Sequence, residues 1–215
     1  MAEVIPTILT ADFSEYTEKL NVLKEISDRV QVDIIDGKFV KNQTISLESL
    51  KNEPTSLRVD LHLMVKEPEE WVNRALEILP DRVIGQVEMM YEPLKFVNRM
   101  VEGGIELGIA LDLETPVESV SEEIYHMVDL VLLLSVKAGF SGQKFDQRVL
   151  EKIEKVKKIV GDLVGIGVDG GLDEKKIPLC QKAGANIFYI GNSFWEAKDL
   201  GKRYNGLVKL VKVKS

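Results

Sequence analysis

Three side chains stand out as candidates for chemistry because each lies within or directly after a run of apolar residues: Asp33, His62 and Asp169. Carboxylate, imidazole and carboxylate are a suitable donor set for a divalent metal ion, which could hold the carbonyl and hydroxyl oxygens of a sugar. An acid in an otherwise buried strand favours a functional site. The histidine alone decides nothing, since a lone strand histidine is often a hydrogen-bonded core residue.

The stretch VQVDIIDGKFV, residues 30–40, shows how one strand could present two polar groups. Gln31 and Asp33 are two residues apart, so both point to the same face of an extended strand, while the apolar residues 30, 32 and 34 cover the other face. Asp36 and Gly37 then form a turn signal. By contrast, we expect Asp12 to cap the helix that begins near Phe13.

Glycine-rich segments follow three of the later apolar runs. They contain Gly139, Phe140, Ser141 and Gly142 in one loop, Gly170 and Gly171 in the next, and Gly191, Asn192 and Ser193 before a short helix. Any one of them could simply make a tight turn. Three such loops side by side favour a site where backbone N–H groups hold a phosphate.

These residues need a scaffold of parallel strands. Short apolar runs rich in valine and isoleucine alternate with segments of helical period along the whole chain. The expected strands are residues 4–9, 30–35, 57–63, 83–87, 107–111, 130–136, 164–168 and 187–190, and the expected helices are residues 13–26, 69–79, 94–101, 149–160, 175–183 and 200–213. Continuous apolar strands indicate a parallel sheet covered by helices. Eight units predict a (β/α)8 TIM barrel formed by a single α/β domain, residues 1–215, with a doubly wound open sheet as the competitor.

Composition excludes several classes of protein. The net charge is -7, with no dense basic cluster, which argues against a nucleic-acid partner. The longest apolar run, residues 130–134, is far too short for a membrane helix, and the first residues lack signal-peptide character. Cys180 is the one cysteine, so no internal disulfide or thiolate cluster is expected; we expect it to pack in a helix. Together these features predict a cytoplasmic protein.

At the level of motifs, the chain resembles the ribulose-phosphate 3-epimerase family nearly from end to end. PTILTADF at 6–13 is similar to P-S-I-L-S-A-D-F, DIIDGKFVKN at 33–42 to D-V-M-D-G-H-F-V-P-N, and DLHLM at 60–64 to D-x-H-L-M. SVKAGFSGQKF at 135–145 is similar to T-V-N-P-G-F-G-G-Q-K-F, and VDGG at 168–171 is identical to the family's V-D-G-G.

The resemblance implies a (β/α)8 barrel that interconverts D-ribulose 5-phosphate and D-xylulose 5-phosphate. The family's two acid/base aspartates fall on Asp33 and Asp169, and they act on opposite faces of an enediolate held by one divalent metal ion of the zinc, iron, manganese or cobalt type. The metal set falls on Asp33, His62, Asp169 and Gln31. The substrate-contacting serine falls on Thr10, His62 also faces the substrate, and the phosphate positions fall on the three glycine loops. A homo-oligomer is consistent with the family.

Several positions depart from the family pattern near the expected mouth of the barrel. Gln31 replaces a metal-binding histidine, and a glutamine oxygen is a weaker ligand for zinc-like metals than imidazole is. The other departures are Gln86, Ile35, Leu134, Lys38, Lys137, Ala138 and Asn192. They leave open an epimerase of a related ketose phosphate such as allulose 6-phosphate, or a barrel that binds sugar phosphate without turnover. Related decarboxylases and synthases carry D-x-K where this chain has Asp60-x-His62, so we set them aside.

Overall fold

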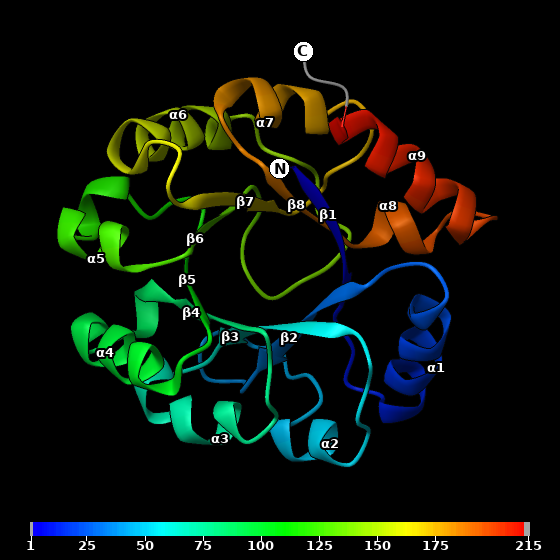
Figure 1. The fold of residues 1–215 in the computed structure, drawn as a ribbon, viewed down its shortest axis with the longest axis horizontal. Coiled ribbons are helices and arrows are strands. Elements are labelled where there is room, and N and C mark those ends of the chain that lie inside the picture. Colours follow the sequence, from blue (N-terminus) through cyan, green and yellow to red (C-terminus); the bar gives the residue numbers. More distant parts are fainter. Residues whose placement is uncertain (1, 213–215) are drawn as a thin grey trace.

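The protein is a closed barrel of eight parallel strands surrounded by helices, as the sequence predicts (Figure 1). The computed structural model describes residues 2–212. Each strand pairs with its neighbours in chain order, and β8 closes the ring against β1. The strands are β1 (Glu3–Ile8), β2 (Arg29–Ile35), β3 (Arg58–Met64), β4 (Arg82–Gln86), β5 (Glu106–Leu111), β6 (Leu130–Leu134), β7 (Gly165–Asp169) and β8 (Ile187–Ile190). The open-sheet alternative is therefore wrong.

Helices form the outer ring. They are α1 (Phe13–Lys24), α2 (Leu47–Lys51), α3 (Val72–Leu76), α4 (Pro93–Gly103), α5 (Glu122–Met127), α6 (Arg148–Val160), α7 (Ile177–Ala183), α8 (Asn192–Trp195) and α9 (Leu200–Lys212). Asp12 caps α1 as predicted, since its carboxylate accepts a hydrogen bond from the Glu15 amide at 3.1 Å. Cys180 is buried in α7, also as predicted. Residue 213, the last of the predicted final helix, lies outside the described residues.

Two helical segments differ from the prediction. The expected helix at 69–79 is a 3-10 turn (Pro68–Glu70) followed by α3, because the buried carboxylate of Glu69 accepts the backbone amides of Tyr91 and Glu92 instead of facing solvent. On α6 the apolar stripe is confirmed, but Lys152, expected among the exposed charges, is buried, and its ammonium donates to the backbone carbonyls of Asp112 and Leu113.

Alternation along each strand divides the interior into two parts. On β2, residues 30, 32 and 34 pack in the large apolar cluster between barrel and helices. Residues 29, 31, 33 and 35 face the barrel axis instead. A smaller apolar cluster, which includes Ile5, Ile84 and Leu132, fills the inside of the barrel. Polar side chains inside the barrel are thus flanked by apolar ones.

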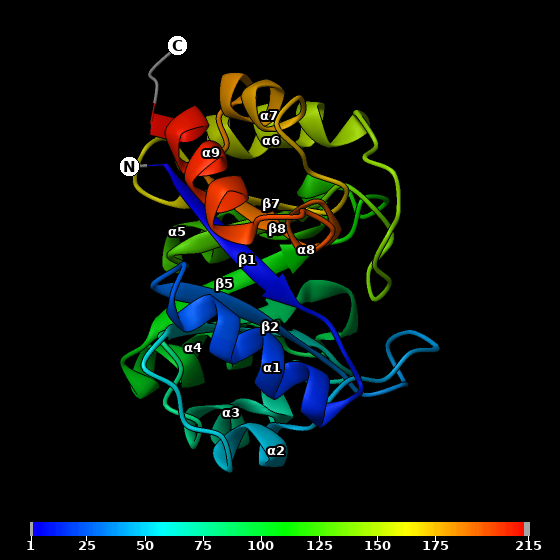
Figure 2. The same ribbon diagram turned by 90° about the vertical axis from the view of Figure 1, so that its right-hand side faces the viewer.

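The strands place the candidate residues at one end. In Figure 2 the arrowheads of β1 and β5 point toward the side from which the loops after β2 and β6 project. This is the C-terminal end of the barrel, where TIM-barrel enzymes hold their active sites. The first and last elements, β1 and α9, pack against each other on the outside of the ring (Figures 1 and 2). Within residues 2–212, no helix has both the length and the apolar character that a membrane crossing needs.

Candidate active site

A cleft of about 540 Å³ opens at the C-terminal end of the barrel. Twelve of the fourteen predicted site residues line it: Asp33, His62, Gly139, Phe140, Ser141, Gly142, Asp169, Gly170, Gly171, Gly191, Asn192 and Ser193. Segments that are distant in the sequence therefore meet around a single cavity. The other two, Thr10 and Gln31, do not form its wall, although each contacts a residue that does.

The two candidate acids lie at the floor of this cleft, one on β2 and one at the end of β7. Asp33, His62 and Asp169 each offer a ligand atom, and these atoms all lie within 4.8 Å of one another. Gln31 connects the acids, since its Nε2 donates to Asp33 Oδ1 at 3.0 Å and to Asp169 Oδ2 at 3.1 Å. Four inward-facing side chains from three strands thus form one polar cluster, which we call the upper cluster.

His62 is held from both sides of its ring. Its Nδ1 lies 3.1 Å from Asp33 Oδ1, and its Nε2 donates to Gln86 Oε1 at 2.9 Å. Burial opposes the charged imidazole, but the hydrogen bond and charge of Asp33 outweigh it, so the pKa of His62 is raised. The core-residue interpretation of this histidine is therefore insufficient: it is buried, and it also contacts a candidate acid and lines the cleft.

The two carboxyl groups have different environments. Desolvation and the nearby charge of Asp33 raise the pKa of Asp169 to about 7. A carboxyl group with a pKa near neutrality can give or accept a proton at physiological pH. The pair therefore combines a group that holds a proton easily with a second carboxylate within reach, which is the arrangement that acid/base chemistry needs.

The upper cluster also fits a divalent cation. Ligand atoms at right angles around an ion, each about 2.1 Å from it, lie about 3 Å apart. Asp33 Oδ1 lies 3.1 Å from His62 Nδ1, and the Gln31 amide lies at 3.0 and 3.1 Å from the two carboxylates. Because Nε2 of His62 donates to Gln86, the Nδ1 lone pair of the neutral ring is left for the ion. These residues can hold a metal, whose binding would displace a proton from the cluster.

The glycine loops form the wall beside the acids. Gly139, Gly142, Gly170 and Gly171 all have positive φ angles, between 56° and 109°, which glycine adopts without strain. A Cβ on Gly171 would lie 2.5 Å from the backbone nitrogen of Phe145, so the loops after β6 and β7 touch backbone to backbone. Hydrogen bonds tie the loops together: Asn42, after β2, donates to the Gly139 carbonyl after β6, and Ser193, after β8, donates to the Leu172 carbonyl after β7.

Thr10, the predicted substrate-contacting residue, lies behind the residues that line the cleft. Its hydroxyl donates to the carboxylate of Glu15, and Glu15 is the residue that lines the cleft. Lys19 pairs with Glu15 at 2.6 Å and lies over the ring of Trp195, 5.1 Å from its centroid. Glu15, Lys19 and Trp195 form a side-chain wall that sequence reasoning missed, because helical position alone does not show which residues of α1 and α8 face the cleft.

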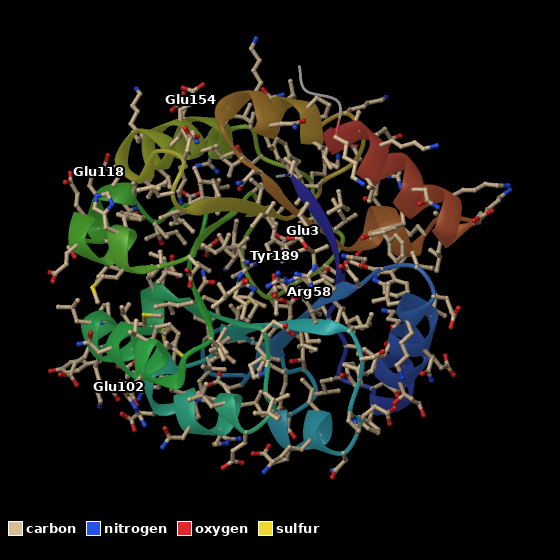
Figure 3. The ribbon with its side chains drawn as sticks, in the orientation of Figure 1. Glu3, Arg58, Glu102, Glu118, Glu154 and Tyr189 are labelled. Carbon is tan, nitrogen blue, oxygen red and sulfur yellow. The ribbon has the colours of Figure 1, made fainter. Side chains whose placement is uncertain are left out.

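A second polar cluster lies toward the other end of the same barrel, and it was also missed; four of its five members are buried, and Glu106 is at its exposed edge. This lower cluster consists of Arg29, Asp60, Arg82, Glu106 and Tyr189. The guanidinium of Arg29 donates to Asp60 at 2.7 Å and to Glu106 at 2.9 Å. Figure 3 shows Tyr189 inside the ring of strands, whereas Glu102, Glu118 and Glu154 lie on its outer side.

The lower cluster explains why Asp60 does not join the upper one. Asp60 precedes His62 by two residues on β3, so it faces the axis nearer the N-terminal end, where Arg29 and Arg82 begin their strands. A usable signal was present in the sequence: charged residues at 29, 82 and 106 stand immediately before or at the start of expected strands. In a closed barrel the starts of the strands converge, so such charges meet.

Comparison with known proteins gives close relatives over the whole chain. The family model described as the ribulose-phosphate 3 epimerase family matches residues 3–195. The ribulose-phosphate 3-epimerase of Bacillus subtilis is 35% identical over 211 residues, which cover 94% of this chain and 96% of the relative. The enzyme of the same name from Helicobacter pylori is 32% identical over 210 residues, covering 95% and 96%.

Among solved structures, likeness extends to barrels of distant sequence. A tryptophan synthase alpha-subunit variant from Pyrococcus furiosus aligns with a TM-score of 0.67 and 14% identity, over 98% of this chain and 96% of that one. At this identity the likeness concerns the fold alone, and it confirms the TIM-barrel architecture.

Proposed function

The chain belongs to the ribulose-phosphate 3-epimerase family, a family of isomerases, and on that premise we propose that it interconverts D-ribulose 5-phosphate and D-xylulose 5-phosphate. The observation that carries this proposal is the pair of carboxyl groups at the floor of the cleft. Asp33 and Asp169 come from strands on different sides of the barrel, and Gln31 holds them together. Epimerisation at C3 needs two such groups, one for each face of the carbon.

In the proposed reaction one aspartate removes the C3 proton and the other returns a proton to the opposite face. Asp33 on β2 and Asp169 at the end of β7 both line the cleft, so each carboxyl group can serve one face of C3. The roles exchange in the reverse direction. A divalent metal ion held by Asp33, His62, Asp169 and Gln31 would supply positive charge for the enediolate oxygens.

The glycine loops are proposed to hold the phosphate. Gly170, Gly171, Gly191 and Asn192 line one side of the cleft, and their closely packed backbones can present N–H groups to an anion. Lys19 lies at the same cavity and adds positive charge. A phosphate anchored there places the sugar carbons over the acids, so that proton transfer occurs within a fixed geometry.

The experiment is epimerisation of D-ribulose 5-phosphate by the purified protein in heavy water. We expect xylulose 5-phosphate to form and to carry deuterium at C3. Asp33→Asn and Asp169→Asn should each lower kcat/KM by about 10³-fold or more, because each removes one of the two proton carriers. Unimpaired turnover in either variant would end the two-base proposal.

A second candidate substrate is a related ketose phosphate such as allulose 6-phosphate. The observation that favours it is the polar wall of Glu15 and Lys19, which can bond an additional hydroxyl group. A substrate panel separates the two: the higher kcat/KM identifies the preferred sugar. If the C3 proton of no ketose phosphate in the panel exchanges with solvent, the protein binds sugar phosphate without turning it over. We further propose that the protein acts in the cytoplasm. We also propose that it associates into a homo-oligomer, which light scattering can test.

A further inference from the structure

In the upper cluster, the side-chain amide of Gln31 forms hydrogen bonds to described residues through its nitrogen but not through its oxygen. Its side chain is fully buried on β2. Nε2 makes the two hydrogen bonds to Asp33 and Asp169, while Oε1 has no hydrogen-bond partner within residues 2–212. A buried carbonyl oxygen without a partner is unfavourable, so this orientation needs a reason.

The reason is electrostatic. One carboxyl oxygen of Asp33 and one of Asp169 face the amide, and the NH₂ group, with its two N–H donors, is the end that can bond to both at once. Turning the oxygen toward them would place three acceptors together. The nitrogen therefore takes the place between the acids, and the oxygen is left without a partner as the consequence.

We propose that Gln31 is a reversible metal ligand, whose amide rotates by half a turn when a divalent cation enters the upper cluster, so that Oε1 replaces Nε2 at the ion. The proposal rests on the metal site of the proposed function. The cation itself neutralises the two carboxylates, which removes their need for the N–H group. Oxygen and nitrogen exchange positions about the last side-chain bond, so the fully buried β2 strand does not have to move.

Gln86 provides an internal comparison, because it is the second buried glutamine of this site. Its Oε1 already accepts the His62 Nε2–H bond at 2.9 Å, so it has a reason to keep its orientation whether or not the ion is present. The Gln86 atom without a partner among the described residues is Nε2, which takes no part in the hydrogen bond between Gln86 Oε1 and His62. We therefore expect the Gln31 amide to turn and the Gln86 amide to stay.

The rotation has a consequence for metal choice. With Oε1 as ligand, the ion has oxygen donors from Asp33, Asp169 and Gln31 and a single nitrogen donor from His62. Oxygen-rich sets suit harder cations such as Mn²⁺ and Mg²⁺, whereas additional imidazole favours Zn²⁺. Gln31 should therefore shift the selectivity of the site toward manganese, relative to a variant with histidine at this position.

The direct test uses the unmodified sequence. In protein labelled with ¹⁵N at its six glutamines, the side-chain NH₂ signal of Gln31 is followed by NMR while Mg²⁺ is added. We expect it to shift more than the other five, because its two hydrogen bonds to carboxylates are lost, while Gln86 changes little. A Gln31 signal that stays in place while the metal binds would overturn the proposal.

The sign of an affinity change gives a second test. Gln31→Met keeps the length of the side chain but removes both the oxygen ligand and the competing N–H group. Mn²⁺ binding, measured by electron paramagnetic resonance, should weaken at least about tenfold if Oε1 is a ligand. Unchanged or tighter binding contradicts the proposal, since removing a mere competitor helps the ion. Gln31→His should raise Zn²⁺ affinity relative to Mn²⁺ about tenfold or more.

Turnover is measured separately, with and without a chelator, so that the two proposals can fail independently. Epimerase activity without metal binding would overturn the Gln31 proposal and leave the substrate assignment standing. If metal binds and the Gln31 amide signal shifts but no epimerisation occurs, the substrate assignment is overturned and the Gln31 proposal stands.

Discussion

The upper and lower clusters share strands β2 and β3 and yet differ in their balance of acidic and basic side chains. β2 contributes Arg29 to one and Asp33 to the other, and β3 contributes Asp60 and His62. In the lower cluster two arginines face two acids, and the hydroxyl of Tyr189 also donates to Asp60 at 2.8 Å. The upper cluster holds two acids with one imidazole. Among the described residues each cluster has one buried polar atom without a hydrogen-bond partner, Gln31 Oε1 in the upper cluster and Arg82 Nε in the lower one.

The difference teaches which buried charges serve the fold and which serve the chemistry. A charge-balanced, hydrogen-bonded group is the form in which a barrel tolerates buried ions. A group with two acids and one imidazole is incomplete without a cation. In this barrel the balanced cluster lies toward the N-terminal end and the incomplete one at the C-terminal end, as expected for TIM-barrel enzymes.

The largest effect on stability should come from removing the central acid of the lower cluster. Asp60→Asn leaves Arg29 and Arg82, both buried, with Glu106 as their one remaining acid in the cluster. We expect it to lower the free energy of unfolding by about 3–5 kcal/mol, measured by urea denaturation. Asp33→Asn is the matched control in the upper cluster and should cost less than about 1 kcal/mol, because it relieves repulsion. Equal losses would remove the distinction between the clusters.

Metal should act on the upper cluster alone. At about one hundred times its dissociation constant, Mn²⁺ should stabilise the protein by about 2.7 kcal/mol in the same denaturation experiment. Asp33→Asn should lose most of this gain, whereas Glu106→Gln should keep it. A similar loss in both variants would mean that the two clusters respond as one unit.

The raised pKa of Asp169 predicts a pH dependence with a definite sign. The folded protein holds this proton up to about pH 7, while the unfolded chain releases it near its ordinary value of 3.8, so stability falls as the pH rises between those values. Asp169→Asn removes this fall. In the presence of a chelator, the variant should gain stability over the parent on the order of 4 kcal/mol at pH 8, and nearly nothing at pH 4. A constant difference across this range would contradict the shift.

The smallest effect should come from the hydroxyl of Tyr189. Tyr189→Phe removes the hydrogen bonds to Asp60 and Arg82 but leaves the ring in place. We expect a loss of about 1–2 kcal/mol in unfolding free energy and unchanged epimerase kinetics. An effect on kcat would show that the lower cluster is coupled to the reaction.

The barrel itself was predictable because parallel strands that are buried on both faces consist of continuous apolar runs. All eight strands lie within two residues of their predicted bounds. The short helices α2 and α5 have too few apolar positions to show a period. The prediction of one helix at 69–79 was wrong for a different reason. The carboxylate of Glu69 accepts a hydrogen bond from the backbone amide of Tyr91, and no local pattern reveals a partner 22 residues away.

The acids of the site were predictable because a carboxylate inside an apolar strand is conspicuous. Their partners were less so. Gln31 was identified as sharing a face with Asp33, but its bond to Asp169 depends on how β2 and β7 face each other across the barrel. Glu15 was not identified, because its place at the cleft depends on how α1 packs beside β1 and on its contact with the Thr10 hydroxyl, which no local pattern shows.

The backbone contact at Gly171 also sets limits on redesign of this enzyme. One wall of the cleft has no side chain to exchange, since a methyl group at Gly171 would collide with the backbone of Phe145. Elsewhere the cleft is lined by side chains, among them Glu15 and Lys19 of α1. New substrate preferences should therefore arise by mutation of Glu15 and Lys19 on α1, while the anchoring loops remain constant.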